Sequence, residues 1–235
     1  MLFTLLRIGI LCCAFTLSVI PVPAQDNRIL PSCPFDIIIA LDFSGSEIDY
    51  LDEIRTALVA LTNPFELGEG SLKVGIITFN RGAEVVLPLT GNTAEMDEAV
   101  DALRITSIVY ATDIHAGIDL AGEQFRLRSE TGVPKFLVLI SDGDPHAHAR
   151  GRGFQADLRS VARLKEGDLD AGIEPVHVFS LYTGRFSPYQ DYFDEIVRKA
   201  SIQHMRTLAS DERSFFYFEQ YPLVVDFFKR ISNCQ

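Results

Sequence analysis

Four short apolar runs recur along the chain, and each is rich in β-branched residues with little alternation between apolar and polar positions. They are Phe35–Asp42, Leu72–Phe79, Lys135–Asp142 and Pro175–Leu181. This pattern is typical of strands that are buried on both faces of a sheet. Two weaker strand candidates are Ala83–Leu89, whose Pro88 suits an edge strand, and Ser214–Phe218.

Helical patterns separate these runs. In the stretch after the first strand, Leu51, Ile54, Leu58 and Leu61 fall three and four residues apart, so they share one helix face. Similar stripes occupy Met96–Leu103, Ile114–Phe125, Leu158–Leu164, Tyr192–Ala200 and Leu223–Ile231. The alternation predicts one doubly wound α/β domain, with a mostly parallel central sheet and helices on both faces.

The first residues have a different character. One positive charge at Arg7 precedes an apolar run, two prolines and the small residue Ala24, which is the pattern of a secretory signal peptide. We therefore expect a signal peptide over 1–24, a lead-in over 25–32 and the domain over 33–235. The alternative is an uncleaved membrane anchor, although the apolar run is short for one. The prediction is a secreted, extracellular protein, or a periplasmic one if the source is bacterial.

Cleavage would leave two cysteines, Cys33 and Cys234, one at each end of the domain. In an oxidising compartment an even pair at the termini of a compact domain predicts a disulfide, and two free thiols are the alternative. The chain has 21 basic and 32 acidic residues. This balance argues against nucleic acid and anionic membranes as partners. No later apolar stretch reaches about 18 residues, so we expect no membrane insertion of the mature chain.

Oxygen-bearing side chains gather where predicted strands end. Asp42 ends the first strand, Ser44 and Ser46 follow at alternate positions, and Asp142 ends another strand. Ligands of open parallel sheets bind at this edge. Carboxylates and hydroxyls are hard oxygen ligands that suit a small divalent cation, and Thr112 adds a hydroxyl if its loop lies at the same edge.

Local explanations exist for the same residues. Asp42 and Ser44 could cap the helix that follows them, and Thr112 with Asp113 forms a good N-cap sequence before the next helix. Asp142 before a glycine is also a common turn. His146 and His148 are too few ligands for a structural zinc site.

Three segments together resemble the von Willebrand factor type A domains, which include the inserted domains of integrins. They are DFSGS (Asp42–Ser46), YATDIHAGI (Tyr110–Ile118) and FLVLISDGDP (Phe136–Pro145). In order and spacing they match the three loops of that family's metal-ion-dependent adhesion site. The resemblance covers roughly Cys33 to Cys234. One departure is Tyr110 with Ala111, where the family often has two glycines.

The resemblance implies a role for each matched residue. Ser44 and Ser46 look like direct ligands of magnesium or manganese, and Thr112 looks like the ligand of the high-affinity state. Asp42 and Asp142 look like carboxylates that act mainly through bound water. The implied partner is an extracellular protein that offers an acidic side chain to the ion. Negative charge also crowds the motifs, which helps to hold a cation but would repel an acidic ligand unless Arg81, Arg150 or Arg152 compensates. The acidic residues concerned are Glu47, Asp49, Asp113 and Asp144.

Enzyme signatures are weak in this sequence. DFSGS lacks the first glycine of a nucleophile elbow, and neither a phosphate-binding glycine loop nor an H-E-x-x-H motif is present. The sequence therefore predicts a non-enzymatic domain that binds protein through a cation. The alternatives are a structural module without a working metal site and a metal-dependent hydrolase that uses Asp42 and Asp142.

Overall fold

A computed structural model of the chain describes residues 28–104, 111–143, 153–168, 172–184 and 192–234. The predicted signal peptide lies outside these residues, as do Tyr110, Asp144, His146, His148, Arg150 and Arg152. None of the helices in the described part is long and apolar enough to cross a membrane.

A six-stranded sheet forms the centre of the molecule, with the order β3-β2-β1-β4-β5-β6. Neighbouring strands are parallel except β3, which runs antiparallel to β2 at one edge. The strands are β1 (Phe35–Asp42), β2 (Leu72–Phe79), β3 (Ala83–Thr90), β4 (Lys135–Ser141), β5 (Val176–Tyr182) and β6 (Phe215–Tyr217). The predicted mostly parallel α/β sheet is confirmed, with exposed Pro88 on the edge strand.

Both faces of the sheet are covered, which explains why the central strands lack alternation. In β1, Ile37, Ile39 and Leu41 belong to one apolar cluster, whereas Ile38 and Ala40 belong to the other. Every residue of β1, β2 and β4 is buried. Long apolar runs are therefore what this sheet requires of its central strands.

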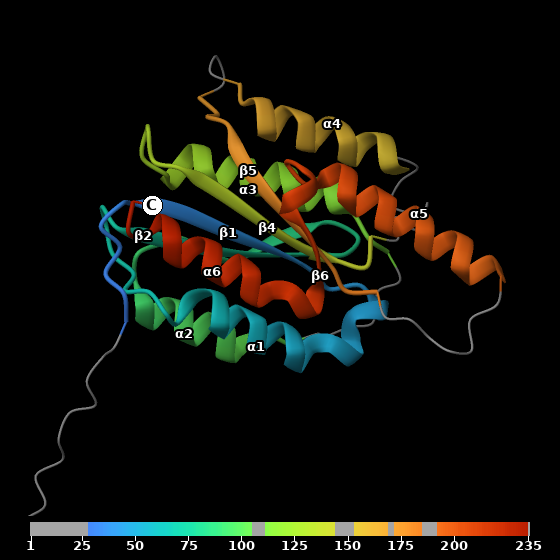
Figure 1. Ribbon diagram of the computed structural model, residues 1–235, viewed down its shortest axis with the longest axis horizontal. Coiled ribbons are helices and arrows are strands. Elements are labelled where there is room, and N and C mark those ends of the chain that lie inside the picture. Colours follow the sequence, from blue (N-terminus) through green and yellow to red (C-terminus); the bar gives the residue numbers. More distant parts are fainter. Residues whose placement is uncertain (1–27, 105–110, 144–152, 169–171, 185–191, 235) are drawn as a thin grey trace, which may run out of the picture.

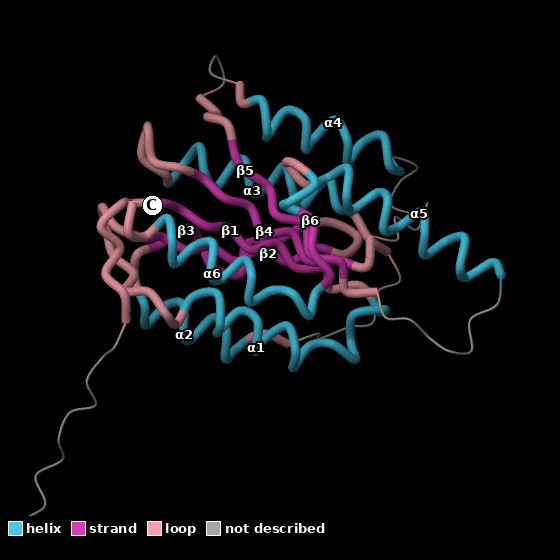
Figure 2. The backbone as a smooth tube through the Cα atoms, in the orientation of Figure 1, coloured by secondary structure: helices cyan, strands magenta, loops and turns pink. Residues whose placement is uncertain are grey.

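In the described part of the chain, helices cover both faces of the sheet (Figure 1). On one face lie α1 (Leu51–Thr62), α2 (Thr93–Ala102) and α6 (Tyr221–Ile231), and on the other lie α3 (Ile114–Arg128), α4 (Gly153–Glu166) and α5 (Tyr192–Leu208). Figure 2 shows the strands between these two layers. The chain enters α1 through the 3₁₀ helix η1 (Gly45–Tyr50).

The helices generally extend beyond the apolar stripes that predicted them, and α5 and α2 illustrate two physical reasons. The α5 helix continues beyond Ala200 to Leu208, because Met205 and Leu208 are fully buried against the rest of the domain. Polar residues between Ala200 and Leu208 interrupt the apolar stripe, so the sequence pattern ended too early. The α2 helix begins at Thr93, where the Asn92 side chain accepts hydrogen bonds from the backbone N–H groups of Ala94 and Glu95. A side-chain cap of this kind stabilises the first helical turn.

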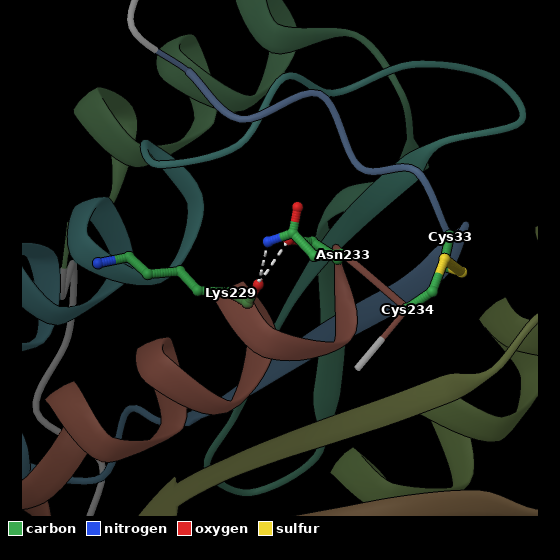
Figure 3. The surroundings of a disulfide bond; sticks show 5 residues. Cys33, Lys229, Asn233 and Cys234 are labelled. Carbon is green, nitrogen blue, oxygen red and sulfur yellow. Dashed lines mark hydrogen bonds between the residues drawn. A yellow bond between two sulfur atoms is a disulfide. The ribbon is translucent and has the colours of Figure 1, made fainter.

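A disulfide joins the two ends of the domain, as Figure 3 shows. Cys33 precedes β1 and Cys234 follows α6, with their Cα atoms 5.6 Å apart. The backbone N–H of Ser32 also donates to the carbonyl oxygen of Ser232 at 2.8 Å. The end of α6 is therefore attached to the start of the central strand.

Candidate metal centre

Asp42 lies at the centre of the carboxyl edge of the sheet and is completely buried. The hydroxyl of Ser141, at the end of the adjacent strand β4, donates to Asp42 Oδ2 at 2.6 Å. The backbone N–H of Ser44 donates to Asp42 Oδ1 at 2.8 Å. These bonds hold both carboxylate oxygens in fixed positions.

Ser44 and Ser46 project their hydroxyls toward each other. Their Oγ atoms are 2.9 Å apart, and Ser44 is buried whereas Ser46 is exposed. Ser44 occupies the N-cap position of η1, but its side chain makes no capping hydrogen bond there. Helix capping therefore does not explain the serine side chain at this position.

The Glu47 side chain turns into the same region and is only 1% exposed. The Thr183 hydroxyl, just after β5, donates a hydrogen bond to Glu47 Oε1. Glu47 Oε2 is buried and has no hydrogen-bond partner among the described residues. Carboxylate oxygens of Asp42, Glu47 and Asp142 all lie within 4.8 Å of one another.

This grouping of carboxylates changes their acidity. Burial, and next the neighbouring Asp142 carboxylate, raise the pKa of Asp42 from 3.8 to about 7. Burial, followed by repulsion from Asp42 and Asp142, also raises the pKa of Glu47 well above its ordinary value. A divalent cation would relieve this repulsion, so the orphaned Glu47 oxygen and the hard oxygen donors fit such an ion.

Thr112 stands just before α3 and is buried. The next residue, Asp113, caps that helix, because its Oδ1 accepts from the Ala116 backbone N–H at 3.3 Å. The Asp113 backbone N–H donates to the carbonyl oxygen of Asn80, which follows β2, at 2.7 Å. This bond holds the threonine loop at the sheet edge where Asp42 lies, and the capping role belongs to Asp113.

Gly143 sets the direction of the chain after Asp142. Its φ of +65° lies in the left-handed region, and a Cβ atom there would come 2.4 Å from Met205 Cγ. The Gly143 N–H also donates to Ser141 Oγ at 3.0 Å. The exit of β4 therefore packs closely on α5, which fixes the position of Asp142.

Two features beside this centre could not be predicted from the sequence. Thr183, the partner of Glu47, lies in no motif that could have indicated it. His115 is buried, and its backbone N–H donates to Asp157 Oδ1 at 2.9 Å. His204 Nε2 lies 2.9 Å from Asp157 Oδ2, so the start of α3 is linked to α4 and α5.

Comparison with known proteins agrees with this geometry. The sequence model of the von Willebrand factor type A domain matches residues 36–230. Matrilin-4 of Mus musculus is 27% identical in an alignment of 169 positions that covers 63% of this chain and 27% of that protein. Integrin alpha-11 of Mus musculus is 27% identical over 169 residues, covering 71% of this chain and 13% of that protein. The chain thus spans less than a third of the length of either relative.

A solved structure shows the same fold. Proximal thread matrix protein 1 from the mussel byssus, described with a zinc-occupied MIDAS motif, aligns with a TM-score of 0.56 and 18% identity. The alignment covers 84% of this chain and 46% of that one. The family match, the sheet order and the acidic cluster at the carboxyl edge of the sheet agree with one another. The chain belongs to the von Willebrand factor type A domain family.

Proposed function

We propose that this protein is a secreted adhesion domain that binds magnesium or manganese at the carboxyl edge of the sheet and binds an extracellular protein through that ion. Asp42, Ser44, Ser46, Thr112 and Asp142 would hold the ion. The observation that carries the proposal is the buried convergence of carboxylate oxygens from Asp42, Glu47 and Asp142 beside two serine hydroxyls. Such a set supplies hard oxygen ligands and negative charge in one place.

The proposed ligands also explain how a partner could take part. Three of the five are neutral hydroxyls, so they leave the ion part of its positive charge. An acidic side chain of the partner would then complete the coordination shell. The named relatives, a matrilin and an integrin, support an extracellular protein as the partner class.

Cation binding is expected to stabilise the protein more at pH 8 than at pH 5. Because the pKa of Asp42 is raised to about 7, the folded protein binds more protons than the unfolded chain between about pH 4 and 7. The stability contributed by protonated Asp42 is therefore present at low pH and is lost as the pH rises through about 7. A cation replaces that proton, so it competes poorly at pH 5 and well at pH 8.

Thermal unfolding of chelator-treated protein, with and without magnesium or manganese at both pH values, measures this effect. At a free cation concentration 100 times the dissociation constant, one bound ion adds about 2.7 kcal/mol to the free energy of unfolding. The Asp42→Ala/Ser44→Ala variant is the control and should show no cation response at either pH. An equal increase in wild type and variant would mean that the ion binds elsewhere, and no increase in wild type would favour a structural module.

A further inference from the structure

Glu47 is placed in the metal centre by the backbone that follows the serines. The η1 helix begins at Gly45, and in its first turn the Glu47 side chain is buried while Ser46 is exposed. Its carboxylate reaches the region between the ends of β1, β4 and β5, as its neighbours Asp42, Asp142 and Thr183 show. Glu47 lies outside the five residues that the sequence motifs assign to the ion.

The two oxygens of this carboxylate have different surroundings. Oε1 accepts the hydrogen bond from Thr183, whereas Oε2 is buried with no hydrogen-bond partner among the residues that the structure describes. A buried polar atom that loses water and gains no partner costs about 1–3 kcal/mol, and more when it is charged. An ion bound to Oε2 would remove this cost.

Resting on the proposed function, we propose that Glu47 is a sixth ligand, which binds the divalent cation directly through Oε2. Glu47 raises the number of carboxylates at the centre from two to three. Since ligand charge is one of the factors that set the affinity of an oxygen site for a cation, the chain itself would hold the ion before any partner contributes an oxygen.

Thr183 acts as a positioning residue in this arrangement. Its hydroxyl fixes Oε1, and its backbone N–H donates to the carbonyl oxygen of Ser141 at 3.1 Å. Thr183 is therefore bonded to Ser141 at the end of β4, the same residue whose hydroxyl donates to Asp42. Partners that orient a metal ligand commonly affect affinity although they do not touch the ion.

Calorimetric titration of magnesium, and separately manganese, into the chelator-treated mature protein tests this role. Glu47→Gln keeps the size and the hydrogen-bond acceptor but removes the charge, and Thr183→Val removes only the hydroxyl. Glu123→Gln is the matched control, because it removes one charge from an exposed position of α3. Circular dichroism establishes that each variant is folded.

We expect Glu47→Gln to weaken cation binding by about 100-fold or more, since residues that only orient a ligand already contribute 10–100-fold. Thr183→Val should weaken cation binding less than Glu47→Gln does. The affinity of Glu123→Gln for the cation should stay within about 2-fold of wild type, as expected for an exposed charge that solvent and salt screen. If wild type binds and Glu47→Gln binds as tightly as Glu123→Gln, Glu47 is not a ligand, although the proposed function stands. If wild type binds no cation, both proposals fail. Should Glu47→Gln not fold, unchanged affinity in Thr183→Val overturns the role of Glu47.

Discussion

Replacing both domain cysteines, as Cys33→Ser/Cys234→Ser, is expected to lower the free energy of unfolding by about 5 kcal/mol. The disulfide joins residues 201 positions apart, so it restricts nearly the whole unfolded chain. In the chain-entropy account a loop of this length gives a value near the top of the range for native disulfides. Guanidinium unfolding under non-reducing conditions measures the difference.

The control for this variant is the response to reducing agent. Dithiothreitol should destabilise the wild-type protein by a similar amount and should leave the double serine variant unchanged. A loss below about 1 kcal/mol would contradict the prediction, since it would place this bond at the bottom of the known range. The Ser32 to Ser232 backbone hydrogen bond would then be sufficient to hold the two ends together.

Truncation of Phe228 to alanine is expected to cost about 3–5 kcal/mol, the usual range for a buried phenylalanine. Phe228 is fully buried and attaches α6 to the sheet. Its ring stacks on Phe35 with centroids 5.7 Å apart and meets the edges of Phe136 and Phe179 at 5.4 and 5.7 Å. The truncation would leave a cavity among three aromatic rings.

Leu223→Ala provides the matched comparison on the same helix. Leu223 is 51% exposed, so its truncation should change the free energy of unfolding by no more than about 0.5 kcal/mol. Urea unfolding of both variants separates the two effects. Equal losses for Phe228→Ala and Leu223→Ala would show that α6 is not held by the aromatic cluster.

The sheet could be predicted from sequence because its central strands are buried on both faces. Such strands are continuous apolar runs with clear ends, and Phe35–Asp42 and Leu72–Phe79 agree with the structure at both ends. Helix ends were less predictable. Leu208 of α5 is buried by tertiary packing, and the polar residues before it conceal the apolar stripe.

The metal centre was predictable to a more limited extent. Asp42, Ser44 and Ser46 form a recognisable motif at the end of one strand. In the structure the Ser44 backbone N–H donates to Asp42, and the hydroxyls of Ser44 and Ser46 lie 2.9 Å apart. The position of Glu47 depends on how η1 turns, and its contact with Thr183 joins residues 136 positions apart. No local pattern encodes such a contact. The signal peptide, the identity of the ion and the acidic donor of the partner stay predictions.

Direct measurement of cation binding by the protein tests the central claim. Magnesium, and separately manganese, would be titrated calorimetrically into chelator-treated wild type and into a folded Asp42→Ala/Ser44→Ala variant. The proposed function predicts saturable binding of one ion per chain to wild type and none to the variant. Absence of binding up to about millimolar cation, the weak end of the range for extracellular sites, would contradict it, as would equal binding by both proteins.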